Sequence, residues 1–370
     1  MFKKILKISA VLLLISLLVG GAVGYYLYQQ IYVPNISQEK KEYELFIPTG
    51  ASFQQVVDSL KENEILKNPS SFEWVAQKMN YENKIFPGRY ILKTGWNNRE
   101  LVNLLRAGKQ TPLNLTINNI RTKEQLVSLV GQKLEADSIK FTQFLNDTTA
   151  LAAINFTPEN VISVFVSDTY EFWWNTNEKQ FFERMLKEYN KFWTETRVSQ
   201  AKERNLTPFE AITLAAIVEE ETLKTDEMPR VAGVYLNRLR KEWPLQADPT
   251  VKFAVGDFTL KRILKKHLAV ESPYNTYLNA GLPPGPIRIP IKRAIEAVLK
   301  SETHKYMFFC AKEDFSGYHN FVKTLKAHNK NAEAETIVQM MEQGGAQMVY
   351  HGMSEEDVKN IMRYPFNMIA

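Results

Sequence analysis

The segment that most constrains the fold of this chain is 207–222, which predicts a helix that is apolar on every side. Thr207 can cap the first free N–H groups, Pro208 suits the first helical position, and Glu210 completes a capping box. At 100° per residue the apolar side chains go nearly all the way round: Phe209, Ile212, Leu214, Ala215, Ala216, Ile217 and Val218. We therefore expect an interior helix that other elements enclose.

Three consecutive carboxylates, Glu219, Glu220 and Glu221, end this helix. Glu221 falls in line with Leu214 and Ile217, Glu219 also stacks over apolar residues, and Glu220 falls on the most polar side. A carboxylate against apolar neighbours resists ionisation, so its pKa should rise, as a general acid near neutral pH requires. The alternative is a frayed helix end whose carboxylates are solvated.

The motif at 217–222, Ile-Val-Glu-Glu-Glu-Thr, resembles the Ile-Ile/Val-Glu-Lys-Glu-Thr motif of the YceG-like (MltG) endolytic murein transglycosylases. The similarity continues in ordered blocks at 234–239, 245–251, 273–277, 281–287 and 328–330. In that family the Glu just before the Thr is the catalytic acid/base, so the resemblance implies this role for Glu221. Glu220 replaces the family's Lys, which places a second negative charge nearby.

Composition limits the other classes of function. The net charge of +5 is small for 370 residues and the basic side chains are scattered, so we expect no nucleic-acid partner. The single cysteine, Cys310, excludes an intrachain disulfide. The five histidines lack metal-ligand spacing, so a metal site is not expected. The acid/base role that the resemblance implies for Glu221 needs no cofactor.

Residues 8–28 form an uncharged apolar run, and about 20 apolar residues suffice to cross a bilayer. Lys3, Lys4 and Lys7 precede the run and should hold the N-terminus in the cytoplasm. We expect residues 1–30 to form a single-pass anchor in the bacterial cytoplasmic membrane, with the rest of the chain on its outer, or periplasmic, face. A cleaved signal peptide is the alternative.

Two domains and a tail should follow the anchor, which makes the chain an α+β protein. Residues 43–110 read as strand, helix, helix and strand, a βααβ order that resembles a LysM-like module; such a module either binds glycan or serves as a spacer. Residues 113–330 should form the larger mixed α+β catalytic domain. The tail, 331–370, departs from the family pattern and predicts helices near 333–343 and 354–362, without an assigned role.

Polar and aromatic residues in the loops of the larger domain are candidates for supporting the site or binding substrate: Gln246, Asp248, Tyr274, Asn275, Tyr277 and His319. Glu219 joins them as a possible support for Glu221. Asp248 precedes Pro249 and could instead cap a helix, and His319 could be structural. Tyr170 or Trp174, in an aromatic segment, could contact sugar or belong to the core.

The resemblance implies a membrane-anchored lytic transglycosylase that cleaves peptidoglycan strands internally. Glu221 would protonate the oxygen between N-acetylmuramic acid and N-acetylglucosamine, then accept the proton of the C6 hydroxyl as the 1,6-anhydro ring closes. Peptidoglycan synthases are candidate partners, and ending the growth of nascent strands is a candidate role. Two alternatives stay open: a hydrolase that pairs Glu221 with Glu219 or Asp248, and a non-catalytic cell-wall binding or scaffold protein.

Overall fold

A computed structural model describes residues 2–314 and 316–332. The chain divides into two compact units. The first unit comprises Met1–Leu115, Val127–Phe141 and Thr169–Phe181, and the second comprises Thr116–Leu126, Thr142–Asp168 and the residues from Phe182 onward. The expected domain boundaries at 43–110 and 113–330 remain predictions, and the helices expected at 333–343 and 354–362 lie outside the described residues.

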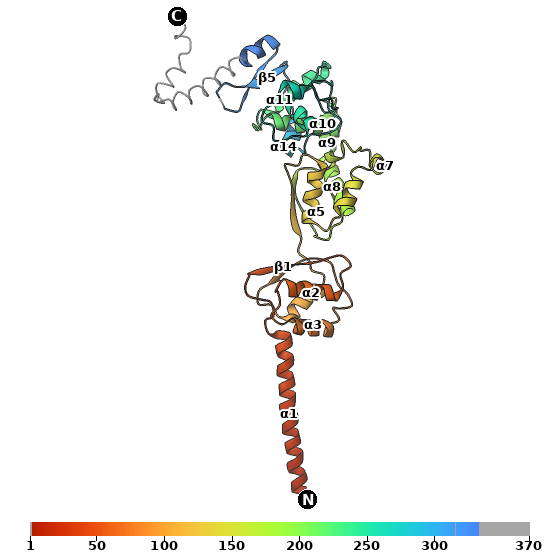
Figure 1. The fold of residues 1–370 in the computed structure, drawn as a ribbon, viewed down its shortest axis with the longest axis vertical. Helices are drawn as coiled ribbons and strands as arrows, with labels where there is room; N and C mark the ends of the chain where they lie inside the picture. Colours follow the sequence, from red (N-terminus) through yellow and green to blue (C-terminus); the bar gives the residue numbers. More distant parts are fainter. Residues whose placement is uncertain (1, 315, 333–370) are drawn as a thin grey trace, which may run out of the picture. The chain divides into compact units, whose positions relative to one another are not determined.

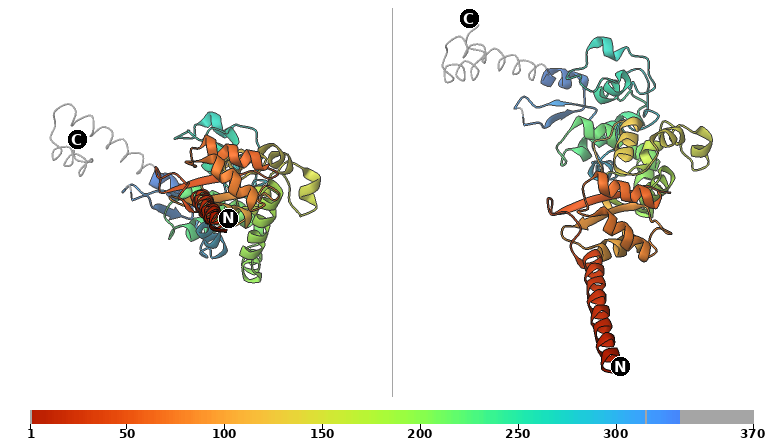
Figure 2. Two further views of the ribbon diagram at one scale, coloured as in Figure 1. Left: turned by 90° about the horizontal axis from the view of Figure 1, so that it is seen from below. Right: turned by 60° about the horizontal axis from the view of Figure 1, so that its bottom comes forward.

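The N-terminal apolar run forms one unbroken helix, α1 (Phe2–Tyr32), as Figures 1 and 2 show. Within the described residues, α1 is the helix that is long and apolar enough to span a membrane: Lys4–Tyr32 has a hydropathy of 2.3 and none of its apolar window is buried. Its last turn is tied to the following module, because the Asn98 side chain donates to the carbonyl of Gln30 over 2.8 Å. A signal sequence would share the length and hydropathy of α1.

The module after α1 follows the expected strand–helix–helix–strand order, and a third helix follows the second strand. Its elements are β1 (Glu42–Ile47), α2 (Phe53–Glu62), α3 (Pro69–Lys78), β2 (Gly88–Lys93) and α4 (Asn98–Arg106). β1 and β2 pair antiparallel, with Tyr43 opposite Leu92. Capping boxes at Ser52 and Asn97 start α2 and α4. The likeness to LysM stays a prediction.

Alternating strand residues and one face of each helix enclose a core in this module: Leu45, Ile47, Val57, Leu60, Phe72, Tyr90, Leu92, Leu101 and Leu105. Further along the first unit, the ring of Trp174 packs on Phe46 with the ring centroids 5.1 Å apart. Tyr170 is also buried. These aromatic residues therefore pack against protein, which favours the core alternative over contact with sugar.

The chain between the module and the apolar helix forms two strands and several helices: β3 (Leu113–Ile117), α5 (Lys123–Lys133), α6 (Ser138–Phe144), α7 (Thr148–Ala152), η1 (Val161–Val164), β4 (Asp168–Phe172), α8 (Glu178–Phe192) and α9 (Glu195–Lys202). β3 and β4 pair in a two-stranded sheet.

The second unit is built around α10 (Pro208–Glu221), the helix that the sequence predicts to be interior. Every residue from Ala211 to Glu219 is buried, and the capping box between Thr207 and Glu210 is formed, so both predictions are confirmed. α10 contacts η1, α9, α11 (Met228–Arg240), α12 (Asp248–Val255) and α14 (Lys292–Leu299). Figure 1 shows α9, α10, α11 and α14 gathered in one group.

Two further features complete the second unit. The short helix α13 (Lys265–Leu268) precedes the proline-rich loop 273–288. A hairpin is formed by β5 (Phe308–Ala311) and β6 (His319–Val322), which pair antiparallel with Cys310 opposite Asn320. α10 is enclosed along most of its length, and three carboxylates, Glu219, Glu220 and Glu221, end it.

Candidate active site

Glu221 is the last residue of α10, and its carboxyl group meets the adjacent helix α11. The hydroxyl of Tyr235, a residue only 1% exposed, donates a 2.6 Å hydrogen bond to Oε1 of Glu221. Burial raises the pKa of Glu221 to about 7; the Tyr235 hydrogen bond opposes this rise and the charge of Asp248 adds to it. Glu221 is half-buried as a whole residue, and with a pKa of about 7 its carboxyl group is poised to exchange a proton near neutral pH.

Asp248 supplies the second carboxylate of the site and comes from the start of α12. The phenol of Tyr277 donates a 2.6 Å hydrogen bond to its Oδ1. The capping position of α12 is Ala247, without a side-chain bond, so the alternative in which Asp248 caps this helix is wrong. Instead Asp248 is exposed, and its negative charge is near enough to favour the protonated form of Glu221.

The backbone before Asp248 is held in an uncommon conformation. Gln246 is exposed and has a φ of 49°, in the left-handed region that residues other than glycine seldom adopt. Its amide donates to the carbonyl of Thr276 over 3.0 Å, and the amide of Ala247 donates to the Thr276 hydroxyl over 3.0 Å. Loop 273–288 therefore fixes the turn that presents Gln246 and Asp248.

Glu219 and Glu220 point into an ion cluster centred on Arg288. Arg288 Nη2 lies 3.1 Å from Glu219 Oε1, and the same guanidinium pairs with Glu220. Arg121 also pairs with Glu220, over 2.9 Å, and the amide of Ile291 donates to Glu219 Oε2 over 2.7 Å. Burial raises the pKa of Glu219, while Arg288 and the Ile291 amide oppose this rise. The cluster ties the end of α10 to the segment that leads into α14.

This cluster explains the polar side of the helix on which Glu220 lies. The sequence assigns Glu220 to the most polar side of the helix because Thr213 lies there. Thr213 is buried, and its hydroxyl donates to the Phe209 carbonyl within the helix. The side chain of Glu220 is 13% exposed, so this face is polar because it holds buried ion pairs and not because it meets solvent.

The sequence of this chain matches a family of known proteins. The model of the YceG-like family matches residues 45–334, most of the chain. The chain belongs to the YceG-like family.

Two relatives of known name are similar to this chain over most of its length. The chain is 29% identical to an endolytic murein transglycosylase of Bacillus subtilis over 335 residues, 86% of this chain and 91% of the relative. It is 29% identical to an endolytic murein transglycosylase of Streptococcus pneumoniae over 339 residues, 83% of this chain and 61% of that longer relative. The crystal structure of a YceG-like protein from Listeria monocytogenes is similar, with a TM-score of 0.53 and 28% identity, covering 79% of this chain and 99% of that one.

Two of the residues that the sequence suggested as supporting or substrate-binding make their contacts elsewhere and not with Glu221. Asn275 is fully buried, and its amide donates to the carbonyls of Leu268 and Val270, so the prediction that it faces a glycan is corrected: it holds its own loop. Tyr274 packs on Phe253 and lines a separate pocket of about 320 Å³.

His319 belongs to the hairpin and fits its structural alternative. Its backbone amide and its ring Nδ1 each lie 2.8 Å from the carboxylate of Glu227, which is only 4% exposed. Since Glu227 immediately precedes α11, this pair joins β6 to the start of the helix that carries Tyr235.

Sequence reasoning missed Tyr235, Arg238 and Arg288. The first two lie in the block at 234–239 that already resembled the YceG-like family, and their polar groups on an otherwise apolar helix were the available signal. Arg238 donates to the carbonyls of Leu245 and Met307, and its charge favours the ionised form of Glu221. For Arg288 the loop sequence offered no such signal. Among the described residues, no group of three or more His, Cys, Asp or Glu could hold a metal ion.

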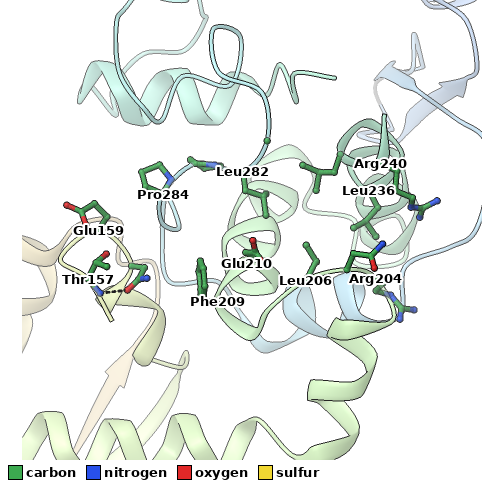
Figure 3. Close-up of a pocket in the computed structure, with 15 residues that line it drawn as sticks. Thr157, Glu159, Arg204, Leu206, Phe209, Glu210, Leu236, Arg240, Leu282 and Pro284 are labelled. Atoms are coloured by element: carbon green, nitrogen blue, oxygen red, sulfur yellow. Dashed lines mark hydrogen bonds between the residues drawn. The ribbon is translucent and has the colours of Figure 1, made fainter. Parts of the chain in front are cut away.

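A pocket of about 750 Å³ lies elsewhere in the second unit, at the N-terminal end of α10 and the C-terminal end of α11 (Figure 3). Phe209 lines it, twelve residues before Glu221, which corresponds to about 18 Å along the helix. None of the candidate catalytic residues lines this pocket. It is therefore distinct from the surroundings of the Glu221 carboxyl group.

Proposed function

We propose that this chain is a membrane-anchored lytic transglycosylase that cleaves the β-1,4 bond from N-acetylmuramic acid to N-acetylglucosamine within peptidoglycan strands. The observation that carries the proposal is the environment of Glu221: burial brings its pKa to about 7, and Tyr235 holds one of its oxygens. The names of the two curated relatives support the substrate class.

Glu221 performs both proton transfers in this proposal. Its protonated form donates to the glycosidic oxygen as the bond to C1 of the muramic acid breaks, which releases N-acetylglucosamine with a free hydroxyl. The resulting carboxylate then accepts the proton of the C6 hydroxyl while O6 bonds to C1. The proton count closes, no water is consumed, and Glu221 ends protonated as it began.

The remaining residues receive supporting roles. Asp248 keeps negative charge beside Glu221, and Tyr277 orients Asp248. Gln246, exposed on its strained turn, is placed to hydrogen-bond sugar hydroxyls or an N-acetyl group. Glu219 stays bound to Arg288 and the Ile291 amide, so it supports the helix end and does not exchange protons with substrate.

A hydrolase that uses Glu221 with Asp248 is the second candidate, because Asp248 is exposed beside Glu221 and could activate a water molecule. Mass spectrometry of purified peptidoglycan digested by the protein separates the possibilities. Anhydro-muramic ends support the transglycosylase, reducing ends support the hydrolase, and the absence of cleavage supports a binding or scaffold protein.

Location and partners follow from the same proposal. With α1 as an anchor and the N-terminus in the cytoplasm, both units lie where peptidoglycan is assembled. Internal cleavage there would end the growth of nascent strands, so peptidoglycan synthases are the proposed partners. The module at 43–110 is proposed to bind glycan, with a spacer as its alternative.

A further inference from the structure

The 750 Å³ pocket described above has the size of a ligand site, since such sites commonly enclose about 300–1,000 Å³. Figure 3 shows Leu206 and Phe209 on one side of it and Leu282 and Pro284 on the other. Apolar side chains thus dominate its middle, where Glu210 also lines the pocket beside Phe209, and its other charged groups lie toward its ends.

The charges at the two ends of the pocket are opposite. Arg204 and Arg240 lie at one end, and Thr157 and Glu159 lie at the other (Figure 3). Arg240 is exposed and has no carboxylate partner among the residues that the structure describes; its guanidinium contacts only the Asn237 side chain, over 3.3 Å. Glu159 is also exposed, and hydrogen bonds from Thr157 and from its own backbone lower its pKa, so it stays ionised.

The wall formed by loop 273–288 is fixed in place. Gly285 passes so close to residue 159 that a Cβ atom there would lie 2.0 Å from the Glu159 carbonyl oxygen. Consecutive prolines at 283 and 284 restrict the same stretch. The loop therefore holds the apolar wall and Glu159 together, and the pocket exists before a ligand arrives.

We propose that this pocket binds the stem peptide that peptidoglycan carries on its muramic acid residues. A stem peptide offers carboxylates to Arg240 and Arg204, an amine to Glu159, and alanine methyl groups to the apolar middle. In a peptide-bearing strand N-acetylglucosamine is uncharged and the carboxyl group of muramic acid is held in the amide bond to the peptide, so the sugars themselves do not match two oppositely charged ends. The separation of about 18 Å along α10 also suits a substituent of the strand better than the bond that is cleaved.

This inference rests on the proposed function, so its test uses two substrates. The full-length protein digests purified peptidoglycan with intact stem peptides and the same strands after an amidase has removed the peptides. Arg240→Glu reverses the charge that has no partner, and Lys241→Glu makes the same change on an exposed neighbour that does not line the pocket. Melting curves check that both variants fold.

Arg240→Glu should lower kcat/KM on peptide-bearing strands by about tenfold and leave cleavage of peptide-free strands unchanged. Lys241→Glu should leave both unchanged. An equal effect of Arg240→Glu on the two substrates, or no effect on either, overturns the peptide site while leaving the proposed function intact.

A binding measurement covers the case in which the wild-type protein cleaves neither substrate and the proposed function fails. The tripeptide L-alanyl-γ-D-glutamyl-L-lysine is titrated into the wild-type protein and into both variants by calorimetry. Saturable binding that Arg240→Glu weakens by about tenfold, and Lys241→Glu does not, supports the site. Absence of binding, or equal binding by all three proteins, overturns it.

Discussion

Tyr235 and Glu221 come from neighbouring helices and meet through a 2.6 Å hydrogen bond in which the phenol donates to Oε1 of the carboxyl group. Tyr235 is almost fully buried, whereas Glu221 remains half-buried. The bond engages one carboxyl oxygen and leaves the other, Oε2, for proton exchange. The phenol also stabilises the ionised form, so it moderates the rise in pKa that burial causes.

Tyr235→Phe removes this hydrogen bond and keeps the packing of the ring. The pKa of Glu221 should then rise above about 7, because the contribution that lowers it is lost. The limb of the pH profile on which activity falls with rising pH should move to higher pH, and kcat should drop by about tenfold. Tyr277→Phe, which breaks the bond to Asp248, is the matched control. An unchanged pH profile in Tyr235→Phe would show that the bond does not tune Glu221.

Glu221→Gln keeps the shape of the side chain and removes the exchangeable proton. Cleavage should fall by about 10²- to 10⁴-fold, or by more, since one residue supplies both proton transfers. Release of anhydro-muropeptides measures the loss, and melting curves monitor folding. Glu203→Gln, an exposed carboxylate of the same unit, should keep full activity. A folded Glu221→Gln protein that cleaves at the wild-type rate would refute the assignment.

The pH dependence of stability follows from the same group. The folded-state pKa of Glu221 is raised from 4.5 to about 7, so the folded protein holds this proton longer than the unfolded chain does. The contribution to stability is complete below pH 4.5 and is lost as pH rises through about 7. Glu221→Gln has no such group to ionise, so it does not lose this stability as pH rises. The melting temperature of the variant minus that of the wild type should therefore be larger at about pH 8 than at about pH 5. A difference that does not change with pH would contradict the raised pKa.

Arg288→Met should destabilise the second unit, because it leaves Glu219 without its buried cationic partner. Removing one partner of a buried ion pair costs about 3 kcal/mol or more of unfolding free energy. Urea unfolding followed by tryptophan fluorescence measures the change. Adding Glu219→Gln should recover part of the loss, since the uncompensated charge is then gone. If the double variant is no more stable than the single one, the pair does not act as argued.

Topology can be tested with reporters fused after residue 370. If α1 is an anchor with its N-terminus in the cytoplasm, alkaline phosphatase at the C-terminus should be active. A fluorescent protein that matures only in the cytoplasm should stay dark at the same position. The opposite pair of results would exclude peptidoglycan as the substrate of this chain.

The sequence by itself determined the features that depend on short-range interactions. The capping box at Thr207 is formed between residues three apart, so its spacing alone predicted it. The interior position of α10 follows from apolar residues on all its faces, and the pairing of β5 with β6 follows from a short connection.

Only the tertiary structure determined which hydrogen-bond or ion-pair partner each polar side chain has. Asp248 could be a cap by sequence, yet the phenol of Tyr277, 29 residues away, bonds to it instead. The sequence places Glu220 on the most polar side of α10, and Arg288, 68 residues away, pairs with it there. Such contacts depend on which helices and loops pack beside α10. The periodicity of a sequence determines which residues are neighbours within one helix or strand. It does not determine which residues of two different elements pack together.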